Sequence, residues 1–97
     1  MLVESIKFSL RITESDFDDE INSLIEMCKS DLETSGVAPS FFEENKEIKL
    51  YNLYQSAVIN YCKAEFGYDN SESERFRKSY EILKTKMVIM SNGLESD

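Results

Sequence analysis

Apolar side chains recur at helical spacing along almost the whole chain, and the residues that interrupt helices are scarce. The 97-residue sequence contains one proline and three glycines. β-Hairpins and β-sandwiches need frequent turns built from these residues, so their scarcity disfavours both. Apolar residues make up 41% of the chain and charged residues 31%, which is ordinary globular composition. The sequence therefore predicts one all-α domain over residues 1–97, near the lower size limit for a single hydrophobic core.

The N-terminal half predicts two helices. The first is short and is expected to end near residues 11–13, because its apolar residues recur every four positions: Leu2, Ile6 and Leu10. The second is expected to have Ser15 as its N-cap and Gly36 as its left-handed C-cap, with Pro39 preventing continuation. Its apolar stripe contains Phe17, Ile21, Leu24, Ile25, Cys28 and Leu32. A loop over residues 37–46, with or without one helical turn, should follow.

The C-terminal half predicts two longer helices, and the short first helix should lie across a core of the other three. The third, from about residue 46 to 66, is apolar around most of its circumference; its polar stripe is narrow and contains Lys49, Asn52, Ser56, Asn60 and Lys63. Such a helix is either the centre of its domain or contacts a neighbouring subunit as well. The fourth is expected to begin at a capping box of Ser71 and Glu74 and to end at Asn92-Gly93. Residues 91–97 then form a flexible tail.

The chain contains no histidine, which removes the commonest general acid/base and the commonest metal ligand. Cys28 and Cys62 form no CxxC pair and fall on apolar helix faces, so we interpret them as buried structural thiols. The acidic run over residues 14–20 resembles a calcium loop only in part, because Ile21 and Met27 replace its required glycine and glutamate. No phosphate-binding glycine loop or nucleophile motif is present. We expect no enzymatic activity, catalytic residue, metal site or cofactor.

Charge is distributed unevenly along the chain. There are 19 acidic and 11 basic residues, giving a net charge of -8. This sign argues against nucleic acid or an anionic membrane as the main partner, and no apolar run is long enough to cross a bilayer. The N-terminus lacks the layout of a signal peptide, so we expect synthesis in a cytoplasm. Residues 14–33 hold eight acids and one lysine, whereas the fourth helix carries five basic residues: Arg75, Arg77, Lys78, Lys84 and Lys86.

Three interpretations of these charges remain open, and the simplest is that the basic face of the fourth helix is only a solvated face. A small regulatory domain of the helix-turn-helix DNA-binding type would use the basic fourth helix, although the turn over residues 67–71 is longer than that motif uses. Head-to-tail assembly of identical copies would use both charged faces, because a heterologous contact joins two different patches. The residues expected at such contacts are Asp16, Asp19 and Glu20 on the second helix and Arg75, Arg77 and Lys78 on the fourth.

Six segments of the sequence, taken in their order along the chain, carry a resemblance to a known family. They are Leu10-Arg11-Ile12-Thr13, Phe17-Asp18-Asp19-Glu20-Ile21, residues 24–37, residues 57–68, Glu74-Arg75-Phe76 and Ser79-Tyr80-Glu81. In this order and spacing the sequence resembles the phage head–tail connector proteins, also called head-completion or DNA-packaging adaptors. The resemblance covers nearly the whole chain apart from residues 38–47 and the tail. The loop with Phe41-Phe42 matches no pattern of that family.

The resemblance implies a structural role in the neck of a tailed phage or prophage, with no catalytic residues to carry over. Such proteins assemble as a ring of about a dozen copies beneath the portal protein, with DNA passing through the centre and a stopper or tail-completion protein docking on the other side. Portal contacts are expected at ends and loops, here from Met87 onward and including Met90. Because an acidic lumen would repel the DNA backbone, we predict a net negative lumen, with DNA not bound sequence-specifically. Without the portal as a template, isolated copies can remain monomeric.

Overall fold

The computed structural model describes residues 2–10, 17–65 and 72–95. Within these ranges every regular element is helical, which confirms the all-α prediction. The elements are α1 (Leu2–Leu10), α2 (Asp18–Ser35), the 3₁₀ helix η2 (Pro39–Phe42), α3 (Ile48–Glu65) and α4 (Ser73–Glu95). The short turn η2 falls inside the loop predicted over residues 37–46.

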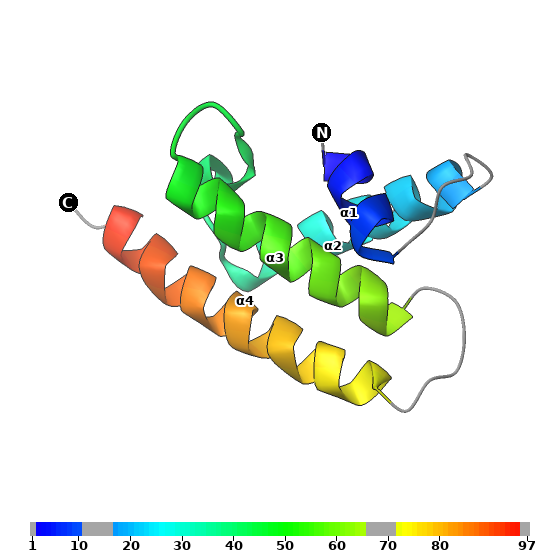
Figure 1. Ribbon diagram of the computed structural model, residues 1–97. Helices are drawn as coiled ribbons and strands as arrows, with labels where there is room; N and C mark the ends of the chain where they lie inside the picture. The colour runs from blue at the N-terminus through cyan, green and yellow to red at the C-terminus, as the bar shows by residue number, and fades with distance from the viewer. Residues whose placement is uncertain (1, 11–16, 66–71, 96–97) are drawn as a thin grey trace.

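Helix α3 is the centre of the fold. It lies antiparallel to α4 along most of its length, and α1 packs on the opposite side of α3 (Figure 1). Helix α2 and η2 also pack against α3, so four elements share its surface. Its buried residues are Leu50, Tyr51, Tyr54, Ala57, Val58 and Cys62. The nearly continuous apolar circumference of this helix is therefore covered within one chain, which is the first of the two alternatives that the sequence left open. Among its large apolar residues Ile48, in the first turn, remains exposed.

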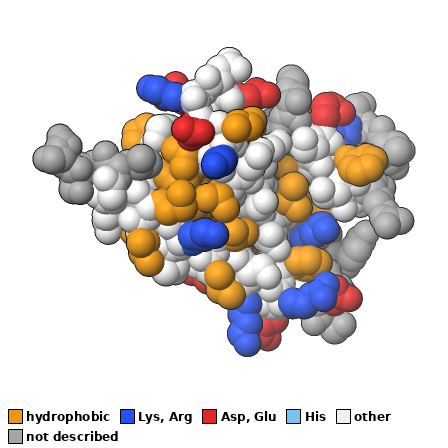
Figure 2. Space-filling model, turned by 60° about the vertical axis from the view of Figure 1, so that its left-hand side comes forward, with side chains coloured by type: hydrophobic (Ala, Val, Ile, Leu, Met, Phe, Trp, Pro, Cys, Tyr) orange, Lys and Arg blue, Asp and Glu red, His pale blue; other side chains and the backbone are white. Residues whose placement is uncertain are grey.

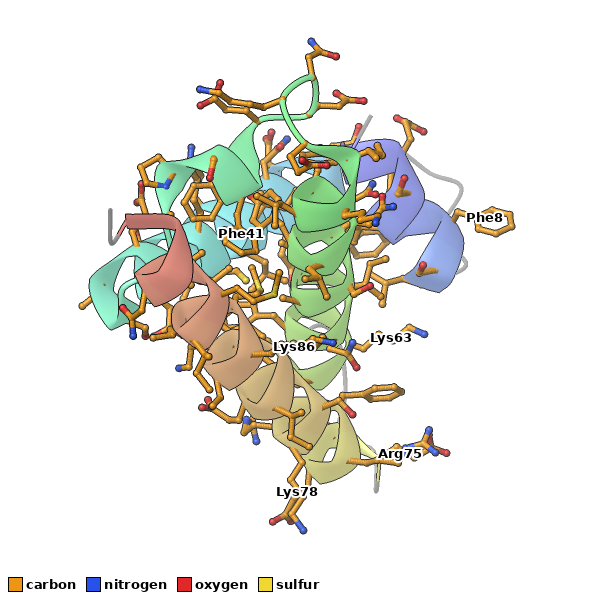
Figure 3. The ribbon with its side chains drawn as sticks, turned by 90° about the vertical axis from the view of Figure 1, so that its left-hand side faces the viewer. Phe8, Phe41, Lys63, Arg75, Lys78 and Lys86 are labelled. Atoms are coloured by element: carbon orange, nitrogen blue, oxygen red, sulfur yellow. The ribbon has the colours of Figure 1, made fainter. Side chains whose placement is uncertain are left out.

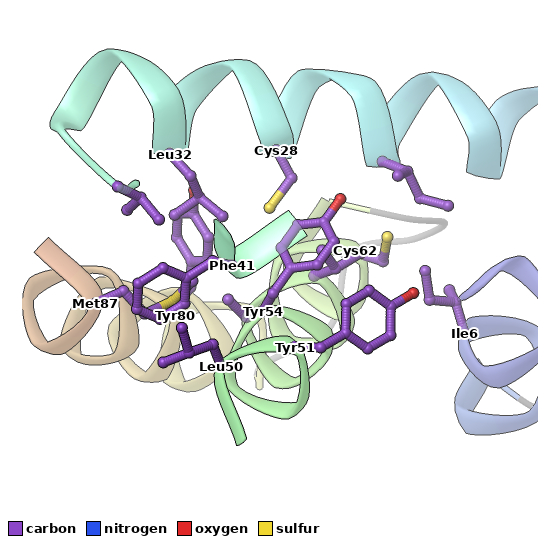
Figure 4. Close-up of a cluster of buried hydrophobic side chains, with 14 of the residues drawn as sticks. Ile6, Cys28, Leu32, Phe41, Leu50, Tyr51, Tyr54, Cys62, Tyr80 and Met87 are labelled. Atoms are coloured by element: carbon purple, nitrogen blue, oxygen red, sulfur yellow. The ribbon is translucent and has the colours of Figure 1, made fainter. Parts of the chain in front are cut away.

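The core gathers fully buried side chains from every element (Figure 4). They include Ile6 of α1, Cys28 and Leu32 of α2, Phe41 of η2, Cys62 of α3 and Met87 of α4. The 3₁₀ turn separates the two adjacent phenylalanines: Phe41 is fully buried, and the Phe42 ring packs edge-on against Tyr54 at 4.9 Å between centroids. The turn that follows α2 is thereby packed against α3.

Of the two predicted caps of α2, only the C-cap is confirmed. Gly36 adopts φ 109°, and its N–H donates to the Glu33 carbonyl at 3.1 Å, so the predicted left-handed C-cap is confirmed. At the other end the N-cap is Phe17, without a side-chain hydrogen bond, so the prediction of Ser15 as the cap is wrong; Ser15 itself lies outside the described residues. Three carboxylates in the first turn still compensate the helix dipole: Asp18, Asp19 and Glu20.

Helix α4 is longer than the sequence predicted. It begins at Ser73, next to the predicted capping box, whose Ser71 lies outside the described residues. It does not end at Asn92-Gly93 but continues to Glu95, so positions 91–95 are helical. The reason is tertiary: Ser91 is fully buried, and its hydroxyl accepts a hydrogen bond from the Ala38 N–H at 2.7 Å. This contact holds the last turns of α4 against the chain that leaves α2, and it outweighs the cost of a glycine within a helix.

Candidate contact surfaces

The acidic end of α2 lies beside α1. Lys7 extends from α1 and forms an ion pair with Asp18 at 2.8 Å, and its side chain is almost fully covered. Asp19 and Glu20, both expected at partner contacts, are exposed on the same first turn. Asp16 lies outside the described residues. The ion pair between Lys7 and Asp18 thus fixes the last turn of α1 next to an exposed acidic surface.

Two of the three basic residues expected at partner contacts form ion pairs within the chain. Arg77 donates to Glu65 of α3 at 2.7 Å, and Arg75 donates to Glu72, which precedes α4. These pairs are solvent-exposed, so each contributes little to folding stability and can be exchanged for another partner. Lys78 is exposed and ion-pairs with no carboxylate among the described residues. Its charge is therefore the most available of the three.

A polar cluster ties α2 to α4. The Tyr80 hydroxyl donates to Asp31 Oδ2 at 2.6 Å, and Lys84 Nζ donates to the same oxygen at 2.9 Å. Burial raises the pKa of the Asp31 carboxyl, but the hydrogen bonds from Tyr80 and Lys84 outweigh it and bring the pKa below its usual range. The acidic second helix and the basic fourth helix therefore meet within one chain at this point.

A cleft of about 260 Å³ lies next to this cluster, between α2, α3 and α4. Charged side chains that line the cleft form ion pairs with one another: Asp31 with Lys84, and Glu65 with Arg77. Tyr61 and Tyr80 meet edge-to-face above it, with ring centroids 5.1 Å apart. The charged groups of this cleft are thus engaged in contacts between helices.

The outward face of α4 carries a mixed apolar and basic stripe that sequence reasoning missed. Lys78, Ile82, Lys86 and Ile89 follow one another at steps of four, four and three residues, and all four are exposed. Ile82 and Ile89 are 69% and 64% exposed, opposite the buried Tyr80 and Met87 of the same helix. Figure 3 shows Lys78 and Lys86 projecting from α4, and basic and hydrophobic side chains lie together across the centre of the face in Figure 2. The available signal was the seven-residue spacing of the two isoleucines.

The two methionines expected at a portal contact differ in their surroundings. Met87 is fully buried in the core, seven residues after the buried Tyr80, so its expected role at a partner surface is wrong. Met90 is partly buried at the edge of the core and lies in the last turns of α4. The buried face of α4, which also carries Tyr80, thus explains Met87 without any partner.

The remaining candidate groups are structural. Cys28 and Cys62 are buried and unpaired, and burial raises the pKa of each thiol to about 12. This confirms their interpretation as buried thiols, which are poorly reactive because the thiolate is the nucleophile. In the described part of the chain, no three potential ligand side chains gather as a metal site requires. None of the helices described combines the length and the apolarity that crossing a membrane would demand.

Taken together, these surfaces define a small helical domain whose polar groups tie helices together and whose exposed patches suit contacts with other proteins. That is the class of a structural assembly subunit. The chain matches the phage connector protein family over residues 2–93, and it belongs to that family. No curated protein and no solved structure gave a significant match. The family gives the chain a structural role at the head–tail junction of a phage particle, in assembly with the portal and other phage proteins.

Proposed function

We propose that this chain is the ring-forming subunit of the connector and performs no reaction. About a dozen copies would form a ring beneath the portal protein, through which DNA passes and onto which a stopper or tail-completion protein docks. The subunit would be made in the cytoplasm of the bacterial host. The observation that carries the proposal is the separation of charge on one helical domain: exposed carboxylates at the start of α2 and available lysines on α4.

Ring contacts would join the acidic start of α2 in one copy to the basic face of α4 in the next. On the acidic side the proposed residues are Asp19 and Glu20, with Asp16 nearby in the sequence. On the basic side they are Lys78, Arg75 and Arg77, the last two by exchanging their exposed intrachain ion pairs for new ones. Portal contact would use the end of α4 around Met90.

Reversal of two charges on α4 tests this contact. The double variant Arg77→Glu/Lys78→Glu is expected to weaken assembly, because it places like charges against the neighbour's acidic surface. Light scattering measures the mass of the assembled oligomer. The double variant Lys46→Glu/Lys49→Glu, at two exposed lysines, is a control with the same change in net charge. An unchanged mass for the α4 variant, with its fold intact by circular dichroism, would count against the proposed contact.

The lumen of the ring is proposed to be net negative, so that DNA slides through without being held. A ring structure with Arg75, Arg77 and Lys78 lining the channel would contradict this account of DNA passage. A gel-shift assay with random duplex at low salt separates the connector from a DNA-binding regulatory domain. We expect no retention; retention with a steep salt dependence would favour the regulatory domain.

A further inference from the structure

Phe8 has no packing role in the described part of the chain. Its side chain is 85% exposed and projects away from the molecule at the end of α1 (Figure 3). The neighbouring residues of the same helix are anchored, because Ile6 is fully buried and Lys7 is held by Asp18. The helix backbone that carries Phe8 is therefore held in place, and aromatic side chains are enriched in the cores of protein interfaces.

Exposed carboxylates lie on the same helix as Phe8 and on the helix that is ion-paired with it. The ion pair between Lys7 and Asp18 attaches the first turn of α2, with its exposed Asp19 and Glu20, to the last turn of α1. Glu4, one turn earlier on α1, is exposed as well. An exposed aromatic side chain on an acidic part of the surface is complementary to a partner that offers apolar surface beside positive charge.

The outward stripe of α4 has that chemistry. Ile82 and Ile89 supply exposed apolar surface, and Lys78 and Lys86 flank them along the same helix face. Neither lysine forms an ion pair among the described residues, whereas Lys84, on the side of α4 that faces α2, is held by Asp31. Two carboxylates border the stripe: Glu81, which is paired with Lys84 at 3.4 Å, and the exposed Glu74, which lines a hollow together with Lys78 and Ile82.

The two surfaces cannot meet within one chain. Helix α3 lies between α1 and α4, so Phe8 and the α4 stripe occupy different sides of the molecule (Figure 1). Complementary patches on different sides of one subunit produce a heterologous contact, which repeats from copy to copy and closes into a ring when the rotation allows.

We infer that Phe8 of one copy docks on the Ile82–Ile89 stripe of the next copy, with Asp19 and Glu20 facing Lys78 and Lys86. This inference rests on the proposed ring and names the surface that forms it.

Disulfide trapping tests the contact, since both native cysteines are buried and resist oxidation. The variants Phe8→Cys and Ile82→Cys, mixed under mild oxidation, are expected to form a mixed dimer in a yield about tenfold above that of Thr34→Cys mixed with Ile82→Cys. Thr34 is also an exposed helical position, on α2 and outside both surfaces. The double variant Phe8→Cys/Ile82→Cys should give a ladder of linked copies, because a heterologous contact propagates.

A charge exchange checks the flanking residues. Adding Lys78→Glu/Lys86→Glu to the Ile82→Cys chain should abolish the mixed dimer, and adding Asp19→Lys/Glu20→Lys to the Phe8→Cys chain should restore it.

A mixed-dimer yield no higher than the control would overturn the inference, as would efficient homodimers of Phe8→Cys or of Ile82→Cys alone. Retention of duplex DNA that depends on Lys78 and Lys86 would also overturn it, by assigning the stripe to a nucleic acid. If one of these results is obtained but the unmodified chain still forms rings, only the inferred contact is wrong. If the unmodified chain forms no ring even with portal protein, the proposed function is wrong as well.

Discussion

The buried hydroxyl of Ser91 offers the sharpest test of how the C-terminal turns of α4 are held. It accepts a hydrogen bond from the Ala38 N–H at 2.7 Å and donates one to the Met87 carbonyl at 2.7 Å. The substitution Ser91→Ala removes both bonds. Without the bond to Met87 no group is left unpaired, because the Met87 carbonyl still has its helical partner. Without the bond from Ala38, the buried Ala38 N–H has no acceptor.

The expected cost follows from these two effects. A buried N–H left without a partner costs about 1–3 kcal/mol. Alanine has the higher helix propensity, which returns about 0.5 kcal/mol. The free energy of unfolding should therefore fall by about 0.5–2.5 kcal/mol, out of a total that is about 5–15 kcal/mol for a domain of ordinary stability.

Urea denaturation followed by circular dichroism measures this change. Ser56→Ala is the matched control, because Ser56 is exposed on α3 and only its backbone carbonyl accepts a hydrogen bond, from Asn60. The control should be neutral or slightly stabilising. If Ser91→Ala proves as stable as the control, the Ala38–Ser91 contact does not hold the end of α4, and our reason for its extension beyond Gly93 is refuted.

Three further predictions concern the cap, the polar cluster and the thiols. Gly36→Ala should lower the free energy of unfolding by about 1–2 kcal/mol, measured by urea denaturation, because the left-handed φ is strained for alanine although its Cβ would meet Val88 only at an ordinary 3.8 Å. The pKa of Asp31 is lowered on folding, so its stabilising effect is present above its ordinary pKa near 3.8 and is lost as the pH falls further. Asp31→Asn should accordingly destabilise the chain at pH 7, with the difference from wild type shrinking toward pH 3; a constant difference would exclude the ionised pair. Cys28 and Cys62 should resist iodoacetamide in the folded chain at pH 8 and react in denaturant, as mass spectrometry would show, whereas rapid labelling of the folded chain would contradict their burial.

Local patterns were sufficient to predict the fold class and most helix positions. The spacing of Ile21, Cys28 and Leu32 marks the buried face of α2, and the single glycine after it marks the C-cap. Both signals depend only on residues close in sequence. Helix ends that depend on distant residues could not be obtained in this way. Ser91 holds α4 through Ala38, 53 positions away, and nothing near Gly93 records that contact.

The candidate surfaces were predicted less completely than the fold. The sequence correctly separates acidic from basic helices, but it does not show which charges are satisfied within the chain. Arg77 lies beside Glu65 only because α3 and α4 are antiparallel neighbours. Met87 was assigned to a surface by its nearness to the C-terminus, although it continues the buried face that contains Tyr80. The exposure of Phe8, Ile82 and Ile89 depends on how the helices pack, and no local sequence pattern determines that packing.

Native mass spectrometry of the purified chain, alone at high concentration and mixed with the portal protein of the same phage, tests the central claim most directly. The account predicts a closed homo-oligomer of about a dozen copies in at least the mixture with portal. A chain that remains monomeric under every condition, portal included, would contradict it.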